Sequence, residues 1–238
     1  VIAGSHGKTT STSLVGNILL ESGLDPTVIN GGIINSLKST AQLGKGEWSV
    51  IESDESDGSF LNLPITYSIV TNIDKEHLDY YGNFENLKKS FKKFIEKTPS
   101  FGKSFICTDN KNLKFLAKRC KNKNYLTYGF NKNSNYQIVN VKKNISNSIF
   151  DLRIKFGKNK TYKIKNLKVN LLGNHNISNA TASIAVALNL GIKVNKIKKA
   201  LGKFLGIQRR FTKVFSIKKK DFFDDYAHHP TEIKAVIN

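Results

Sequence analysis

The first ten residues contain a glycine loop placed between an apolar strand and a helix, and this order constrains the chain to an α/β fold. Val1–Ala3 is apolar, Gly4-Ser5-His6-Gly7-Lys8-Thr9-Thr10 follows, and apolar residues then recur at helical spacing. Glycines let backbone N–H groups turn inward around phosphate oxygens, and the next helix directs its positive N-terminal end at them. The segment therefore predicts a site for a nucleoside triphosphate, with Lys8 on the outer phosphates and Thr9 on Mg²⁺.

The loop is shorter than the usual phosphate loop. Ile2 stands where the six-residue spacing would place a first glycine, so the segment is either a shorter variant or an ordinary glycine turn. The strand before it and the helical pattern after it favour the variant. All seven residues of the loop are candidates for nucleotide contact: Gly4, Ser5, His6, Gly7, Lys8, Thr9 and Thr10.

Composition predicts a protein with a sizeable core that is not exported. The chain has 238 residues, which is enough for one large domain or one domain and part of another. Cys107 and Cys120 lack the spacing of a redox or metal motif, so we expect reduced thiols and a cytoplasmic location. No apolar run approaches the roughly 20 residues that cross a bilayer, so no membrane partner is expected.

The net charge of +20 raises the alternative of a nucleic-acid partner. The lysines are scattered from Phe84 to Lys220 among many asparagines, and no helix concentrates arginines with interleaved aromatic residues. A global compositional bias explains this pattern as well as a groove for a phosphodiester backbone does. We therefore expect no nucleic-acid partner, although a basic phosphate-loop protein that binds nucleic acid remains the alternative from another class.

Alternating strand and helix patterns predict a mostly parallel sheet flanked by helices. Trp48–Ile51, Ser68–Thr71 and Ser104–Cys107 have strand character, as does the short segment Thr27–Asn30 before a turn at Gly31-Gly32. Residues 84–95, 113–118, 176–190 and 194–204 have helical spacing. Shorter alternating strands over 125–172 predict a smaller antiparallel extension, and strands over 211–217 and 222–226 precede a helix after Pro230.

Two acidic or polar segments follow predicted strands, where ligands of open α/β sheets collect. Glu52 opens the acidic run Glu52–Asp57 and is the leading Mg²⁺ ligand, although a solvated acidic turn is the alternative. His77 lies in Asn72–Gly82, after the strand that ends at Thr71. A histidine alone is more often a hydrogen-bonded surface residue than a metal ligand. The other polar side chains in this segment favour a metal ligand here.

Two later segments add candidate nucleotide contacts. Asn176 and Asn179 lie three residues apart near the start of a predicted helix, where their amides could contact a purine edge. A helix cap by Asn174 or Asn176 is the alternative. In Gln208–Phe211 an arginine could stabilise charge on a transferring phosphoryl group, and in Asp224–Glu232 an aspartate could bind ribose hydroxyls. The arginine and the aspartate could each equally belong to an ordinary ion pair.

Read in order, six segments resemble motifs of the Mur ligases, ATP-dependent ligases that build the peptide of bacterial cell-wall precursors. The likeness runs from Ala3 to Glu232, and the segments are, in order, Gly4–Thr10, Glu52–Leu61, Thr71–Asp79, Gly173–Ala180, Arg209–Phe211 and Asp224–Glu232. The resemblance implies a central ATP-binding domain over 1–208 and the start of a second, Rossmann-like C-terminal domain over 209–238. It also implies that the family's N-terminal UDP-binding domain is absent and that the piece alone is inactive.

The resemblance further implies cofactors, partners and roles. ATP would activate the carboxylate of UDP-N-acetylmuramate as an acyl phosphate, which the amino group of L-alanine would attack. Catalysis would rest on Lys8, Glu52, His77 and Arg210, with one Mg²⁺ held by Thr9 and Glu52 and a second Mg²⁺ held by His77. Besides the loop, the nucleotide would contact His175, Asn176, Asn179, Arg210 and Asp225. A recycling ligase that attaches a whole peptide to the same sugar is the near alternative, and folate polyglutamate ligases are more distant.

Overall fold

The computed structural model describes residues 1–121, 124–157 and 160–237. Within these ranges the main sheet has seven strands, in the order β1, β5, β6, β7, β8, β9, β10. Their bounds are β1 Ile2–Ala3, β5 Tyr67–Val70, β6 Lys103–Cys107, β7 Tyr125–Gly129, β8 Tyr136–Lys143, β9 Ser148–Phe156 and β10 Lys160–Val169. The strands from β1 to β8 pair in parallel, and β8, β9 and β10 pair antiparallel. The predicted α/β class is confirmed.

The antiparallel extension begins later than predicted. Tyr125–Gly129 was expected to open it, but this strand pairs in parallel with β6, and β8 pairs in parallel with β7 over a short stretch. The helix between β6 and β7 returns the chain to the same end of the sheet, so the next strand runs in the same direction. β9 runs antiparallel to β8, and β10 runs antiparallel to β9.

A smaller sheet stands beside the phosphate loop. In the part of the chain that the structure describes, β2 (Thr27–Ile34) lies between β3 (Ser39–Gln42) and β4 (Ser49–Ile51). The turn predicted at Gly31-Gly32 is wrong, because both glycines lie inside β2 at a register irregularity between Ile29 and Ile34. Residue Glu52 bridges Ile2 in parallel and so connects the end of β4 to β1.

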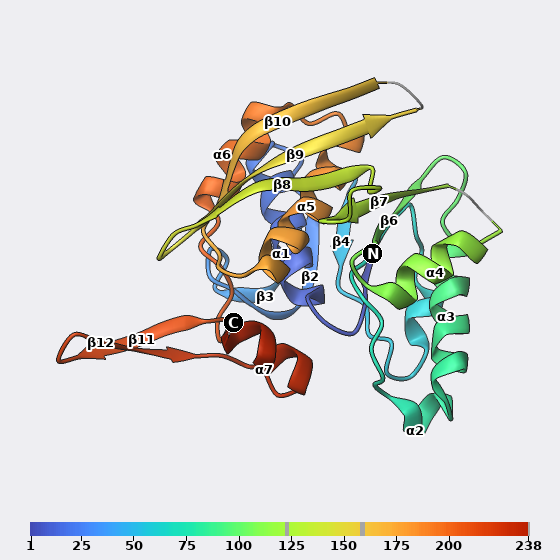
Figure 1. The fold of residues 1–238 in the computed structure, drawn as a ribbon, viewed down its shortest axis with the longest axis horizontal. Helices are drawn as coiled ribbons and strands as arrows, with labels where there is room; N and C mark the ends of the chain where they lie inside the picture. Colours follow the sequence, from blue (N-terminus) through green and yellow to red (C-terminus); the bar gives the residue numbers. More distant parts are fainter. Residues whose placement is uncertain (122–123, 158–159, 238) are drawn as a thin grey trace.

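Helices cover both faces of the main sheet (Figure 1). α1 (Lys8–Glu21), α5 (Asn174–Asn189) and α6 (Val194–Lys203) pack together on one side, while α3 (Phe84–Glu96) and α4 (Lys111–Arg119) lie on the other. The short α2 (Leu78–Tyr81) and the 3-10 helix Ser59–Asn62 follow the carboxyl ends of β5 and β4. This arrangement sets the phosphate loop at the carboxyl edge of the sheet.

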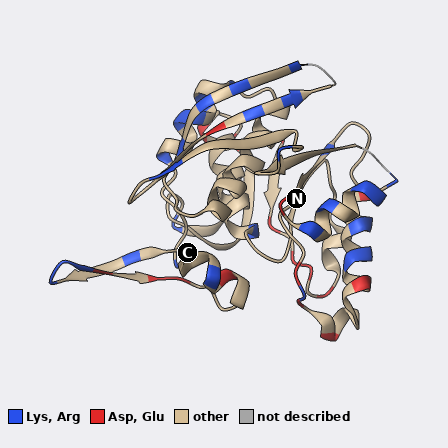
Figure 2. Ribbon diagram, in the orientation of Figure 1, with Lys and Arg blue, Asp and Glu red and all other residues tan. Residues whose placement is uncertain are grey.

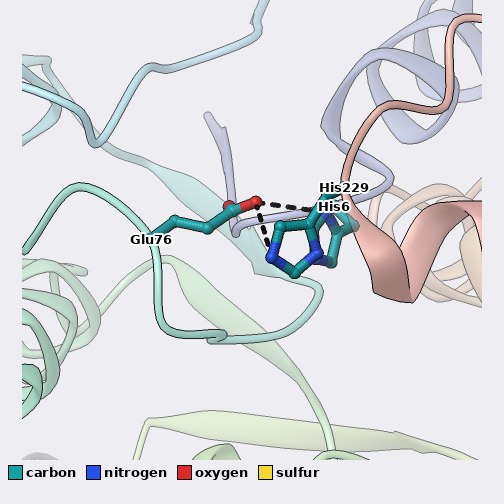
Figure 3. Close-up of side chains that lie close together, drawn as sticks. All are labelled: His6, Glu76 and His229. Carbon is teal, nitrogen blue, oxygen red and sulfur yellow. Dashed lines mark ion pairs between the residues drawn. The ribbon is translucent and has the colours of Figure 1, made fainter.

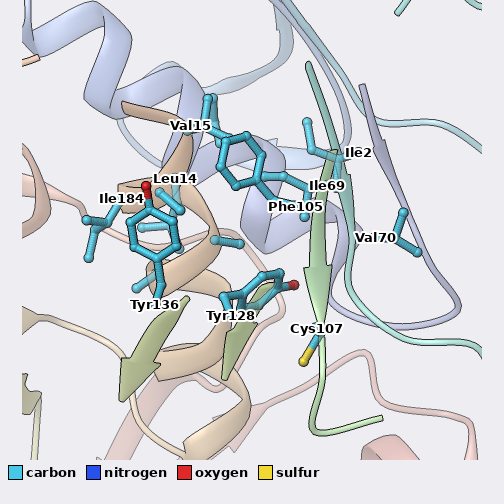
Figure 4. Packing of buried hydrophobic residues seen from close by; sticks show 14 of the residues in the cluster. Ile2, Leu14, Val15, Ile69, Val70, Phe105, Cys107, Tyr128, Tyr136 and Ile184 are labelled. Carbon is cyan, nitrogen blue, oxygen red and sulfur yellow. The ribbon is translucent and has the colours of Figure 1, made fainter. Parts of the chain in front are cut away.

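Buried residues of the core pack around the strand and the helix that flank the phosphate loop. Figure 4 shows Leu14 of α1, Ile184 of α5 and Phe105 of β6 packed around the centre of the sheet, and all three are fully buried. Ile2 and Ile69 pair across β1 and β5 immediately before the site. Burial of these side chains stabilises the strand and helix that flank the loop, each by about 1.5–3 kcal/mol.

The last part of the chain projects from this body. β11 (Thr212–Ile217) and β12 (Lys220–Asp224) form a separate antiparallel pair, and α7 (Pro230–Ile237) follows with no buried residue. Figure 1 shows the hairpin extending away while α7 turns back toward the phosphate loop. A domain boundary at residue 208 stays a prediction, and the hairpin that starts at Thr212 agrees with it.

The basic residues do not gather on one element. Figure 2 shows Lys and Arg on β9 and β10 and on the separate helices α3, α4 and α6, while acidic residues occur in the loop after β4. This distribution agrees with the compositional bias inferred from the sequence. No helix in the described ranges is both long enough and apolar enough to span a membrane.

Candidate active site

The phosphate loop is held in a conformation that requires glycine. Gly4 has φ +137°, and a Cβ on it would lie 2.1 Å from Thr71 Oγ1. Gly7 has φ +81° and is the N-cap of α1, which begins at Lys8. The loop lies against the end of β5, because His6 N–H donates to Asn72 Oδ1 over 2.8 Å. The first-turn N–H groups of α1 have no partner within the helix and remain available for an anion.

Lys8 and Thr9 each meet a carboxylate from the loop after β4. Lys8 Nζ lies 2.9 Å from Glu55 Oε2, and Thr9 Oγ1 donates to Glu52 Oε1 over 2.9 Å. The second oxygen of Glu52 accepts from the N–H of Gly31 over 2.6 Å, which orients the carboxylate. The structure therefore brings together the predicted residues Lys8, Thr9 and Glu52.

Glu55 is a site residue that sequence reasoning did not single out. It is 1% exposed, and burial raises the pKa of its carboxyl although Lys8 acts in the opposite direction. The backbone oxygen of Glu55 also accepts from Tyr81 Oη over 2.5 Å. Its presence in the run Glu52–Asp57 was the only sequence signal, and that run does not show which acid turns inward.

His77, the predicted ligand of a second ion, lies with two carboxylates. It has φ +54° at the start of α2, and its ligand atom lies within 4.8 Å of those of Glu55 and Glu76. Glu52, assigned to the other ion, contacts Thr9 and Gly31. Carboxylate and hydroxyl oxygens are the donors that Mg²⁺ prefers. The group of Thr9 and Glu52 and the group of His77, Glu55 and Glu76 therefore each fit a divalent cation.

A cavity of about 890 Å³ opens between the carboxyl edge of the sheet and the C-terminal segment. This volume falls in the range of roughly 300–1,000 Å³ typical of small-molecule sites. Eight predicted nucleotide residues line it: His6, Gly7, Thr10, His175, Asn176, Asn179, Arg210 and Asp225. Gly4, Ser5, Lys8 and Thr9 belong to the same loop without lining this cavity, and Glu52 and His77 also lie outside its lining.

The first turn of α5 faces the phosphate loop. A Cβ on Gly7 would lie 2.7 Å from Asn179 Oδ1, and Asn179 Nδ2 donates to Asn176 Oδ1 over 3.4 Å. The N-cap of α5 is Gly173 and has no side-chain cap, so the alternative of an asparagine cap is wrong. Burial lowers the pKa of His175, which leaves a neutral imidazole in the cavity wall.

The C-terminal residues complete the opposite wall. Both oxygens of Asp225 accept backbone N–H groups over 2.7 Å, from Phe211 and Ala227. Arg210 lies 3.9 Å from Glu232. Contact with His6 lowers the pKa of Glu232 to about 2, despite the opposing effect of burial.

Comparison with known proteins places this arrangement in a family. The family model described as Mur ligase middle domain matches residues 2–187. The chain belongs to the Mur ligase family. It is 55% identical over 238 residues to a UDP-N-acetylmuramate–L-alanine ligase of Pelagibacter ubique, with 100% of this chain and 51% of that protein covered. A ligase of the same name from Brucella anthropi is 47% identical, with 99% and 50% covered.

Solved structures agree with this membership. The crystal structure of a UDP-N-acetylmuramate–alanine ligase from Thermotoga maritima has a TM-score of 0.84 and 30% identity to this Mur ligase chain. That likeness covers 99% of this chain and 52% of the other. A murein peptide ligase from Psychrobacter arcticus has a TM-score of 0.70 and 26% identity, with 98% and 52% covered. The chain thus spans about half the length of the relatives it matches.

Proposed function

We propose that the protein to which this chain belongs is a cytoplasmic ligase that uses ATP to join L-alanine to the carboxylate of UDP-N-acetylmuramate. The observation that carries the proposal is 55% identity along the whole chain to a ligase of that name. The geometry supports it, because the phosphate loop, α5 and the C-terminal segment contribute to one cavity of ligand size. The chain would supply a central ATP-binding domain over 1–208 and the start of the C-terminal domain.

The reaction needs activation because a carboxylate is a poor electrophile. Transfer of the ATP γ-phosphoryl group to a carboxylate oxygen gives an acyl phosphate and releases ADP, and the alanine amino group then attacks the acyl phosphate carbonyl. Inorganic phosphate then leaves and the amide bond remains. Most of the catalytic effect comes from positioning two anions and neutralising their charge.

Different residues of this chain would position the nucleotide and neutralise its charge. The N–H groups that start α1 would bind phosphate oxygens, and Lys8, already oriented by Glu55, would neutralise the outer phosphates. Arg210 would approach the same phosphates from the C-terminal wall. Asn176 and Asn179 would contact the adenine side, and Asp225, oriented by two backbone N–H groups, would meet the ribose.

Mg²⁺ fits donors on the phosphate loop and on the segments that follow β4 and β5. Thr9 and Glu52 would hold one ion, and His77 with Glu55 and Glu76 a second. When bound, the metal would neutralise phosphate charge and polarise the phosphoryl oxygens. The short contact between Thr9 and Glu52 places a hydroxyl and a carboxylate together before any ion binds.

A substrate test decides the proposal. The full-length protein is given ATP, Mg²⁺ and UDP-N-acetylmuramate, and L-alanine, glycine, L-serine or the tripeptide L-alanyl-γ-D-glutamyl-meso-diaminopimelate is offered separately. We expect phosphate release to be fastest with L-alanine. Turnover with the tripeptide alone would instead identify a murein peptide ligase, and steeply salt-dependent binding of single-stranded DNA without turnover would favour the nucleic-acid class.

A further inference from the structure

Three segments far apart in the sequence bring two histidines and a carboxylate together beside the cavity. His6 comes from the phosphate loop, Glu76 follows β5, and His229 precedes α7. Figure 3 shows Glu76 pointing at both imidazoles, with dashed lines to each. Glu76 Oε1 lies 3.9 Å from His6 Nδ1 and 3.8 Å from His229 Nε2.

The three side chains are partly withdrawn from solvent and lie close together. His6 is 13% exposed, Glu76 18% and His229 26%. The two imidazole rings lie 4.9 Å apart between centroids. One ligand atom from each residue lies within 4.8 Å of the others, so small side-chain rotations would bring all three around one ion.

A second carboxylate is placed behind His6. Asp74 Oδ2 lies 3.4 Å from His6 Nε2, the ring nitrogen that does not face Glu76. Asp74 also accepts from Thr231 Oγ1 over 2.8 Å, which fixes its orientation. Metal-ligating histidines regularly donate their other N–H to a carboxylate, and that contact sets the tautomer and increases ligand basicity. A further carboxylate, Glu232, lies 3.3 Å from His6 Nδ1 and could add a fourth ligand.

We propose that His6, Glu76 and His229 form a binding site for a transition-metal ion such as Zn²⁺, which joins the phosphate loop to the C-terminal segment. Two imidazoles and a carboxylate are a donor set that suits Zn²⁺, Co²⁺ and Ni²⁺, whereas Mg²⁺ prefers oxygen donors. The site shares Glu76 with the group that would hold the second Mg²⁺, and it differs from that group in having two imidazoles and one carboxylate. It does not depend on the ligase activity.

The proton positions are compatible with this coordination. His6 would bind through Nδ1 and keep its proton on Nε2, where it is donated to Asp74. His229 would bind through Nε2 with its proton on Nδ1, which gives up a 3.3 Å hydrogen bond from the N–H of Thr231. That bond is long, so its loss costs little compared with a metal–nitrogen bond.

Titration of the nucleotide-free, full-length protein with Co²⁺ tests the site. We expect one equivalent to give the visible absorption of a low-coordinate ion with imidazole ligands, to be displaced by Zn²⁺, and to persist in excess Mg²⁺. His229→Gln should abolish this signal. Asp74→Ala should weaken Co²⁺ binding by about 10- to 100-fold, the usual effect of removing a carboxylate behind a ligating histidine.

Two histidines provide matched controls. His228 is adjacent to His229, its side chain is 72% exposed, and it does not belong to the cluster, so His228→Gln should keep the signal. His77 shares Glu76 with the oxygen-rich group, and His77→Gln should also keep it. Circular dichroism verifies folding of each variant. Absence of Co²⁺ binding, equal binding by His229→Gln, or loss in His77→Gln alone would overturn the proposal.

Discussion

Substitution of Gly7 by alanine should damage the phosphate loop in two separable ways. Gly7 has φ +81°, a conformation that costs an L-residue about 1–2 kcal/mol. An added Cβ would also lie 2.7 Å from Asn179 Oδ1, in a region where Asn179 is 6% exposed. Asn179 must therefore move when the methyl group is present.

Gly23 isolates the first effect. It has φ +84°, close to the value at Gly7, and a Cβ there would meet nothing within 4 Å. Gly23→Ala should therefore lower the free energy of unfolding by about 1–2 kcal/mol from backbone strain. Gly7→Ala adds an off-rotamer Asn179 and its lost hydrogen bond, so its total should be about 2–5 kcal/mol.

Denaturant unfolding of the two variants and of Gly7→Ala/Asn179→Ala measures these quantities. The double variant should lose less stability than the sum of the two single variants, because removal of the amide makes room for the methyl group. ATP affinity should fall in Gly7→Ala and stay unchanged in Gly23→Ala. Equal unfolding free energies for Gly7→Ala and Gly23→Ala, within about 0.5 kcal/mol, would refute the close contact with Asn179.

Three further outcomes are expected. Lys8→Ala should abolish measurable ligation, since removal of a preorganised charge costs about 2.7–4 kcal/mol of transition-state stabilisation or more. Lys8→Ala/Glu55→Gln, which leaves no buried carboxylate without its cation, should fold normally and stay inactive, and turnover by this folded variant would contradict the role of Lys8. Glu232→Gln should be less stable than the parent above pH 4.5, and the difference should shrink as the pH falls toward about 2. The sign follows because the pKa of Glu232 is lowered from 4.5 to about 2, so its contribution is lost on acidification. Denaturant titrations in EDTA at several pH values measure it, and a gap independent of pH would contradict the assignment. Glu52→Gln should weaken the Mg²⁺ dependence of phosphate release while nucleotide binding without metal is retained, and an unchanged Mg²⁺ titration would exclude Glu52 as a ligand.

Local patterns were sufficient for the elements and for much of the site. Helical spacing predicted α3 and α5 to within a few residues, and the glycine loop predicted the strand, turn and helix around Lys8. Local patterns failed at β2, where Gly31-Gly32 continues the strand instead of ending it. Glycine permits a turn but does not require one, and pairing with β4 supplies hydrogen bonds that a short segment cannot show.

Sequence alone determined which kinds of residue surround the phosphate loop: a lysine, a hydroxyl, acids after two strands, and paired asparagines. Only the tertiary structure decided that Glu55 turns inward to Lys8, that Glu55 and Glu76 are the carboxylates beside His77, and that His229 reaches the phosphate loop. The physical reason is distance along the chain. Spacing and propensity act over one turn or one strand, whereas a contact between His6 and His229 depends on how the whole sheet and the C-terminal segment bring the backbone together.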